Sequence, residues 1–371
     1  MWDNHTMAGV SVPTQAELGR RISGARAEIG MTQADLAAGI GIERTALVRV
    51  EAGERKISAT ELVALAEVLG RPVDWFFTEP PAAVVSRRRD PAVGGFSRTL
   101  DLALELAARD VAFLTKRRIT PTGERTVHRV PASYQEAEEL AGRVRIQAGL
   151  PAGPLRDLQS VAEGLGLLGF SLALGPDAGD AASVQVEDHG VAVINGSTDP
   201  GRRRFSLAHE LGHHLVGDAY EPSPRLGGND SERMLNAFAA YLLLPRTAVL
   251  DVWSDFAGSS VRRAAIAVAV RFSVSWTVAC DQLRNLDLIE SRERDLLVEN
   301  DLRRGELFEF GERFVVELEP PSVPRAYASA IIAAYRHRRL TADRVVELLH
   351  DTVTEDDLPE PDDPSLAEAF S

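Results

Sequence analysis

The sequence predicts a mainly α-helical protein with a small β-sheet, which places it in the α+β class. Apolar residues recur at helical spacing through most of the 371-residue chain. Alternation with a period of two, the pattern of strands, occurs mainly at residues 167–195. Turn residues and shifts in composition divide the chain into five predicted segments: residues 15–77, 78–132, 133–250, 251–305 and 306–371. A chain of this length is expected to form two or three domains.

The composition is that of an acidic globular protein. Lys and Arg number 41 and Asp and Glu number 55, which gives a formal net charge of −14. An acidic chain argues against indiscriminate binding to nucleic acids or membranes, although it does not exclude a local DNA-binding face. The single cysteine, Cys280, excludes an internal disulfide and favours a reducing environment. Because no signal peptide or membrane span is recognisable either, we expect a cytoplasmic protein without membrane contacts.

Residues 15–77 predict a compact module of five short helices. Thr32 and Asp35 lie three apart, close to the capping box that starts a helix. Gly41 is placed to make a tight turn between the second and third helices, and this is the helix-turn-helix arrangement. The predicted helices are a first one spaced by Leu18, Ile22, Ala25 and Ile29, then residues 32–40, 42–51 and 59–69, and a last short turn at 73–77.

This module resembles the Xre/Cro repressor family over roughly residues 15–77. The resemblance lies in Met31-Thr32-Gln33-x-x-Leu36-Ala37 and in Ile42-x-Arg44-Thr45-x-Leu47-x-Arg49-x-Glu51-x-Gly53. It implies that Gln33 contacts a phosphate, and that the third helix faces bases or backbone in the major groove through Glu43, Arg44, Thr45 and Arg49. Lys56 is a further candidate for a phosphate contact.

The charge of the module leaves a second interpretation open. Residues 15–77 contain eight Lys and Arg against nine Asp and Glu, so the net charge of the module is about −1. DNA affinity depends largely on neutralising phosphates, so we expect weak binding by a monomer. A homodimer on a two-fold operator would strengthen it. The alternative is that the module docks a protein.

Residues 78–132 are interpreted as a linker that carries one helix, at 96–115. From residue 133 the pattern changes to two helices, 134–148 and 155–165, and then to three strands at 167–174, 183–187 and 190–195. Asp188-His189-Gly190 is the predicted hairpin turn. The last strand leads directly into the helix with the strongest chemical signal in the chain.

That helix carries His-Glu-x-x-His at His209, Glu210 and His213. Asp199-Pro200 is typical of a helix start and Gly217 of a helix stop. Residues four apart on a helix lie about 40° from each other around its axis, so both imidazoles can reach one Zn²⁺. Glu210 would then lie beside the open position of the metal, where it could accept the proton of a water molecule. The alternative is a helix with two surface histidines.

A third ligand is predicted on the next helix, residues 229–244, which Pro245 closes. A catalytic zinc takes three protein ligands and keeps one position open. Glu232 lies near the start of this helix, and Asn236 is one turn further on the same face. We therefore predict Glu232 as the third ligand, and Asn236 as the group that holds a ligand imidazole in the correct tautomer.

These two helices resemble the active-site blocks of the ImmA/IrrE family of bacterial metallopeptidases. The first block is Arg203-x-Phe205-Ser206-Leu207-Ala208-His209-Glu210-Leu211-Gly212-His213, and the second is Glu232-x-x-x-Asn236-x-Phe238-Ala239-Ala240-x-Leu242-Leu243-Leu244-Pro245. The resemblance implies a minimal gluzincin-like domain with Glu210 as general base. It also implies a substrate, because relatives cleave repressors of the Xre type. An edge strand beside the helix is expected to bind extended substrate, and the hairpin 183–195 is the candidate.

The remaining segments are predicted to be helical. Residues 251–305 read as a second helix-turn-helix-like pattern, at 262–272 and 276–286, which resembles the small helical domain that follows the peptidase in ImmA/IrrE relatives. Residues 306–371 predict a strand at 314–318 and helices at 325–338 and 341–349. The acidic tail from Asp351 onward is expected to be disordered.

Two functional hypotheses follow from the sequence. The first is a regulatory zinc endopeptidase with its own DNA-binding module, which cleaves an Xre-type repressor or an antitoxin-like partner. The second is a non-proteolytic Xre-type transcription factor whose zinc domain senses a signal or docks a partner. Glu210 favours the first, because a purely structural zinc site does not need it.

Overall fold

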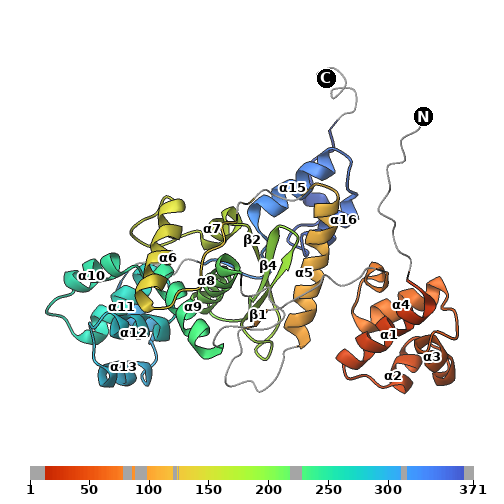
Figure 1. Ribbon diagram of the computed structural model, residues 1–371, viewed down its shortest axis with the longest axis horizontal. Helices are drawn as coiled ribbons and strands as arrows, with labels where there is room; N and C mark the ends of the chain where they lie inside the picture. The colour runs from red at the N-terminus through yellow and green to blue at the C-terminus, as the bar shows by residue number, and fades with distance from the viewer. Residues whose placement is uncertain are drawn as a thin grey trace. The chain divides into compact units, whose positions relative to one another are not determined.

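The computed structural model describes residues 13–77, 86–87, 98–119, 123, 125–217, 228–310 and 316–362. The chain forms two compact units, residues 1–80 and 81–371 (Figure 1). The predicted leader at 1–14, most of the predicted linker before residue 98 and the end of the acidic tail therefore lie largely outside the described residues.

The first unit is the predicted bundle of short helices. Three of them begin with a complete capping box, in which Thr14, Thr32 and Ser58 are the N-cap residues. One apolar side chain or more from each helix enters a common core that is closed to solvent. The elements are α1 (Gln15–Glu28), α2 (Gln33–Gly39), α3 (Arg44–Glu51), α4 (Ala59–Leu69) and the 3₁₀ turn η1 (Val73–Phe76).

A four-stranded mixed sheet lies at the centre of the second unit, in the order β1-β3-β4-β2. β4 pairs parallel with β2 and antiparallel with β3, which pairs antiparallel with the two-residue β1. Every residue of β4 is buried, as expected of a strand that is covered on both faces. The strands are β1 (Ser86–Arg87), β2 (Leu167–Leu172), β3 (Ala181–Val186) and β4 (His189–Asn195).

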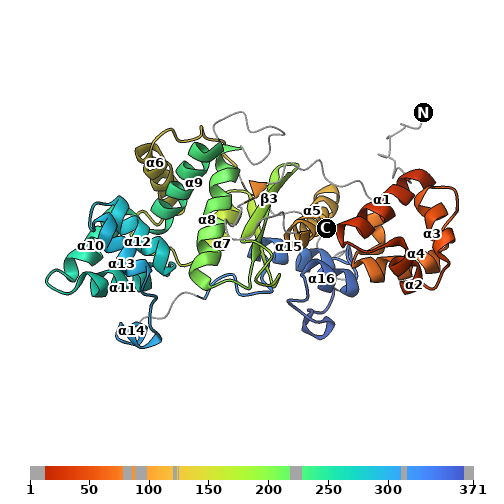
Figure 2. The same cartoon turned by 90° about the horizontal axis from the view of Figure 1, so that it is seen from below.

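Alternate residues of the strands contribute to two separate cores, one on each face of the sheet. In β4, Val191 and Val193 pack with one group of helices, whereas Ala192 and Ile194 pack with the other. Figure 2 shows the sheet between the two groups. On the first face lie α5 (Arg98–Lys116), α15 (Arg325–Arg336) and α16 (Ala342–Leu348), and on the second lie α6 (Tyr134–Gln147), α7 (Leu158–Gly164), α8 (Pro200–Val216) and α9 (Gly228–Leu243).

Helix α5 is part of the core on the first face of the sheet. This corrects its interpretation as a helix within a spacer. Its apolar stripe, including Leu104 and Val111, is buried against the sheet and against α15 and α16. The periodicity of residues 96–115 indicates an amphipathic helix, but it does not say which surface the apolar face covers. The boundaries drawn at 132/133 and 305/306 remain predictions.

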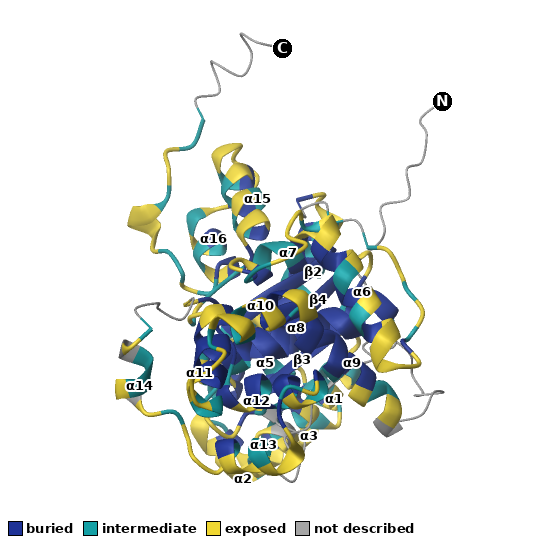
Figure 3. Ribbon diagram, turned by 90° about the vertical axis from the view of Figure 1, so that its left-hand side faces the viewer, coloured by how far each residue is buried: buried dark blue, intermediate teal, exposed yellow. Residues whose placement is uncertain are grey.

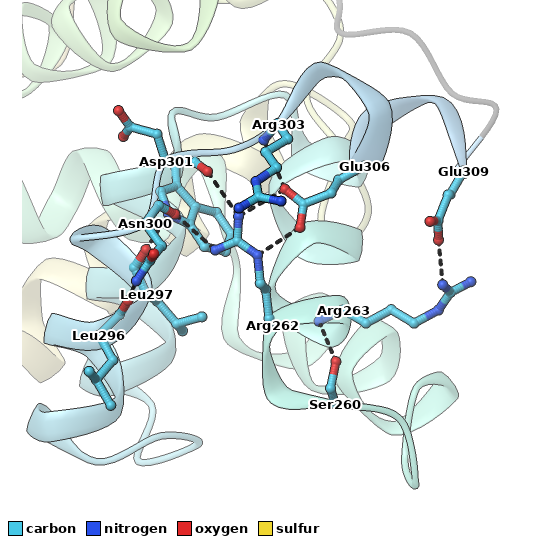
Figure 4. Close-up of polar contacts among 11 residues, drawn as sticks. Ser260, Arg262, Arg263, Leu296, Leu297, Asn300, Asp301, Arg303, Glu306 and Glu309 are labelled. Carbon is cyan, nitrogen blue, oxygen red and sulfur yellow. Dashed lines mark hydrogen bonds and ion pairs between the residues drawn. The ribbon is translucent and has the colours of Figure 1, made fainter.

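A helical subdomain follows α9 and is held together by an arginine on its second helix. The Arg262 guanidinium donates to both carboxylate oxygens of Glu306, at 2.7 and 2.8 Å, and to the carbonyls of Asn300 and Asp301 (Figure 4). These bonds fix the segment around α14 to α11. The subdomain consists of α10 (Arg246–Asp255), α11 (Val261–Phe272), α12 (Trp276–Asn285), α13 (Ser291–Val298) and α14 (Arg304–Phe308).

Several predicted boundaries are wrong by a few residues, each for a local reason. The hairpin turn is Glu187-Asp188 rather than 188–190, because His189 is buried and pairs with Val186. α7 begins at Leu158 rather than 155, because the Asp157 carboxylate accepts from the amide of Ser160.

The C-terminal region also departs from the prediction. Residues 316–318, the described part of the predicted strand at 314–318, are not strand. Residues 351–362 of the acidic tail are ordered: they include a 3₁₀ turn, η3 (Glu355–Asp357), and Asp362 pairs with Arg336 at 2.6 Å. Acidic composition predicts disorder only where the carboxylates lack partners of this kind.

Among the described residues, no individual helix has the length and apolar content that crossing a membrane requires, although two sharply bent helix pairs meet that test jointly.

Candidate metal centre

Helix α8 lies against the sheet and carries the His-Glu-x-x-His motif. Its ends are those that the sequence predicts: the Asp199 carboxylate accepts from the amide of Arg202, Pro200 is the first helical residue, and Gly217 adopts φ 74° at the C-cap. Nearly the whole helix is buried, and it forms the dark centre of Figure 3. A helix in this position holds its side chains in fixed directions, as a catalytic site needs.

A buried ion pair anchors α8 to the rest of the unit. The Arg204 side chain is fully buried, and its guanidinium donates to the Glu317 carboxylate and, at 2.5 Å, to the carbonyl of Leu155. Glu317 also accepts from the amide of Gln159 at 2.7 Å. The pair therefore joins α8, the start of α7 and the segment before α15, which lie far apart in sequence.

Helix α9 packs closely on α8. A Cβ atom at Gly212 would meet the Phe238 ring at 2.9 Å, so a glycine here lets the two helices approach. Phe238 itself is fully buried. This packing sets the register that brings Glu232, near the start of α9, opposite the two imidazoles of α8.

The structure brings His209, His213 and Glu232 together, as predicted. Their nitrogen and oxygen donor atoms all lie within 4.8 Å of one another. The two Nε2 atoms are 3.0 Å apart; that of His209 lies 3.4 Å from Oε2 of Glu232, and that of His213 lies 3.4 Å from Oε1. Both imidazoles are buried, whereas the Glu232 side chain is 45% exposed.

The electrostatics of this cluster favour an ionised Glu232. Burial on its own raises the pKa of the Glu232 carboxyl, but the hydrogen bonds from His209 and His213 outweigh it and hold the pKa below its ordinary value. A carboxylate that faces two imidazoles can bind a divalent cation. The cation then takes the place of the protons in the hydrogen bonds among the three groups.

The donor atoms of the three residues are close enough together for one tetrahedral ion. Zinc bonds of about 2.0–2.1 Å at tetrahedral angles place neighbouring ligand atoms about 3.3 Å apart. The two Nε2 atoms are 3.0 Å apart, and each lies 3.4 Å from a different carboxylate oxygen of Glu232, which is close to that value. The two-histidine and one-carboxylate set is also one that leaves a fourth position open.

Glu210 is fully buried beside the cluster, and the structure adds a partner for it that the sequence prediction missed. The Ser183 hydroxyl donates to Oε2 of Glu210 at 2.6 Å, and both residues are fully buried. Ser183 lies in β3, where the alternation of the strand turns it toward α8 while Ala182 and Val184 face the other core. That alternation was the available signal, although it could not show which residue of α8 Ser183 would meet.

Asn236 is half-buried on the face of α9 predicted for it. Its Oδ1 atom is buried and has no hydrogen-bond partner among the described residues. The predicted hydrogen bond to a ligand imidazole is therefore not made by that atom.

The neighbouring His214 is placed away from the cluster, as its position on the helix predicts. Its Nε2 lies 3.0 Å from the carbonyl oxygen of Leu165, and burial, together with Arg125, lowers the pKa of His214 to about 4. Gly190 makes room for this ring, because a Cβ atom there would overlap it. His214 is thus a neutral packing residue.

In the first unit, most of the predicted DNA contacts have exposed side chains. Arg44, Thr45 and Arg49 project from α3 with exposed side chains, and Glu43 is exposed at its N-cap. Lys56 is exposed as well. Gln33 differs, because its carboxamide donates to Glu51 at 2.7 Å, within a cluster that Arg26 completes.

Each of the two units contains a stretch that matches a known protein family. Residues 162–284, from the end of α7 to α12, match the family described as the IrrE N-terminal-like domain, and residues 22–76 match the helix-turn-helix family. The chain thus carries an IrrE N-terminal-like domain and a helix-turn-helix domain. The IrrE-like region contains the motif of α8, Ser183 and Glu232, so the match covers the whole candidate site.

Two curated relatives of the chain are each named "Radiation response metalloprotease IrrE". The protein of Deinococcus deserti is 34% identical over 142 residues, which is 36% of this chain and 47% of that protein. The protein of Deinococcus radiodurans is 34% identical over 98 residues, or 24% of this chain and 29% of that protein. The chain thus matches less than half of the length of each. Both relatives are named as metalloproteases, and in this chain His209, His213 and Glu232 form a group that could hold a metal ion.

Proposed function

We propose that the chain is a zinc-dependent endopeptidase of the gluzincin-like type that also binds DNA. The observation that carries the proposal is the convergence of His209, His213 and Glu232, each of which offers one donor atom within 4.8 Å of the other two. A buried carboxylate, Glu210, lies in the same helix turn, and a structural metal site would not require it.

The side chains divide the chemistry as follows. When bound, zinc supplies Lewis acidity toward the carbonyl of the scissile peptide bond. Glu210 accepts a proton from the attacking water molecule as the new C–O bond forms, and then passes it to the leaving amine as the C–N bond breaks. Ser183 donates to one carboxylate oxygen of Glu210 and so helps to fix the orientation of that carboxylate.

The proposed substrate is a protein, with an Xre-type repressor or an antitoxin-like partner as the specific candidate. The name of the relatives supports a protease, and the helix-turn-helix unit supports an action near DNA. The exposed side chains of α3, together with Lys56, would contact an operator. A DNA-binding unit on the same chain would bring the peptidase to the site that its substrate occupies, and a homodimer would offset the weak charge of the unit.

A Glu210→Gln variant tests the proposal against the regulator hypothesis. The variant should bind zinc like the wild type but leave a co-expressed repressor intact, because it lacks the proton acceptor. Glu139→Gln, on the exposed face of α6, is the matched control and should cleave normally. If zinc-loaded wild type cleaves neither the co-expressed repressor nor unfolded casein, the peptidase proposal fails. The hypothesis of a zinc-dependent DNA-binding regulator then remains.

A further inference from the structure

The edge of the sheet next to Glu210 is already occupied by the chain itself. The strand order β1-β3-β4-β2 makes β3 the outermost of the long strands, and Ser183 of β3 donates to Glu210 at 2.6 Å. β1 pairs antiparallel with this strand, with Ser86 opposite Ser183 and Arg87 opposite Ala182 (Figure 2). Opposite residues of two antiparallel strands have Cα atoms about 4.5–5.5 Å apart. β1 therefore lies one strand spacing from the residue that contacts the proposed general base.

This edge is also the one that an extended substrate would use. A polypeptide binds to a sheet by adding a strand at an edge, through main-chain hydrogen bonds. The opposite edge, at β2, is joined to another segment, because Ser171 and Ser322 exchange two backbone hydrogen bonds of 2.8 and 2.9 Å. A substrate that pairs with β3 has its backbone beside the strand that contacts Glu210. β1 holds that position in this structure.

β1 belongs to the connection between the two units. The last described element of the first unit, η1, ends at Phe76, and α5 of the second unit begins at Arg98. Ser86 and Arg87 lie between them in the sequence. β1 is thus tethered close to β3, and a tethered ligand has the high effective concentration of an intramolecular partner. A free polypeptide has to displace it from the edge.

The pairing with β1 is short, so a longer strand can displace it. β3 has six residues, Ala181–Val186, and the described residues of β1 pair with two of them. A two-residue antiparallel contact contains about two main-chain hydrogen bonds. A substrate that extends along the whole of β3 would make more hydrogen bonds than β1 makes. β1 therefore excludes short or weakly bound polypeptides and yields to a long extended segment.

We propose that β1 is an inhibitory strand of the peptidase: it occupies the substrate-binding edge of β3, and a polypeptide reaches the metal centre by displacing Ser86 and Arg87. The inference rests on the proposed function, since it concerns access to that same site. It also defines the class of substrate, because displacement favours a segment that is extended over several residues, as in an unfolded or locally opened protein.

The test removes the backbone donors of β1. Proline has no N–H group, so in the double variant Ser86→Pro/Arg87→Pro neither residue can donate to β3. The matched control, Ser86→Ala/Arg87→Ala, loses the same side chains but keeps both N–H groups. The full-length, zinc-loaded proteins are compared on fluorescein-labelled, unfolded casein. In the proline variant KM should fall at least about fivefold while kcat stays within about twofold of wild type, and the alanine variant should match wild type.

Three results would overturn the inhibitory strand. The first is an unchanged KM in the proline variant. The second is an equal fall of KM in the proline and alanine variants, because the effect would then come from side chains and not from main-chain pairing. The third is a cut between residues 80 and 97 of wild type after incubation with zinc, read by mass spectrometry, because the connection would then be a substrate. Melting temperature and zinc content should show that all variants are folded.

A binding measurement separates the two proposals if no casein is cut. Glu210→Gln protein is mixed with labelled, unfolded casein in the presence of zinc, and fluorescence anisotropy gives the dissociation constant. Adding the two proline substitutions should tighten binding at least about fivefold, whereas adding the two alanines should leave it unchanged. Equal affinities overturn the inhibitory strand, whatever the outcome for cleavage. Tighter binding by the proline variant without cleavage by any variant supports the strand and overturns the peptidase proposal alone.

Discussion

Removing the Ser183 hydroxyl should impair catalysis more than it impairs folding. In Ser183→Ala, Oε2 of Glu210 loses a donor at 2.6 Å inside a fully buried site. Hydrogen bonds to charged groups contribute about 1.5–3 kcal/mol. If that energy holds the carboxylate in its working orientation, kcat should fall by about 10- to 150-fold, since each 1.36 kcal/mol is a tenfold change in rate.

The assay compares kcat and KM for one cleaved peptide in wild type, Ser183→Ala and Ser183→Thr. Threonine keeps the hydroxyl and should recover most of the rate, which a purely structural role in β3 would not require. KM and zinc content should stay near those of wild type, because the Ser183 hydroxyl bonds Glu210 and not one of the proposed metal ligands. A Ser183→Ala enzyme with unchanged kcat, or a Thr variant as slow as Ala, would refute the reasoning.

Three further predictions concern stability and use urea unfolding of the purified chain. Glu317→Ala should lower the free energy of unfolding by about 3–5 kcal/mol, because it leaves the buried Arg204 without its counter-ion; a loss below 1 kcal/mol would show that the pair does not anchor α8. Gly190→Ala should cost about 1–3 kcal/mol, because the new methyl group overlaps a buried ring, and a neutral result would contradict that packing. Arg262→Ala should lower the free energy of unfolding by about 1–2 kcal/mol. Arg263→Ala, which removes a pair whose carboxylate partner is half-exposed, should change it by less than about 0.5 kcal/mol. Equal effects would mean that Arg262 does not secure the segment around α14.

Local signals in the sequence predicted much of the site. Asp199-Pro200 and Gly217 mark the ends of α8 because capping depends on neighbouring residues. The spacing of His209 and His213 is also local information, because residues four apart on a helix lie on the same face. Glu232 followed from the next helix, since two helices joined in sequence and both apolar on one side are expected to pack together.

The features that were missed depend on contacts between distant segments. Arg204 and Glu317 are separated by 113 positions, and no local pattern links them. The position of α5 on the sheet was missed for the same reason, because an apolar stripe shows that one face of a helix is buried but does not identify the element that covers it. Ser183 was predicted to lie in a strand, but its contact with Glu210 depends on how α8 crosses that strand.

The zinc content of the full-length protein, measured by mass spectrometry after dialysis, tests the central claim most directly. Wild type and Glu210→Gln should each retain about one zinc ion per chain, whereas His213→Ala and Glu232→Ala should retain little, because each removes one of the three proposed ligands. A wild-type protein that emerges without metal, or a Glu232→Ala protein that keeps as much zinc as wild type, would contradict the account.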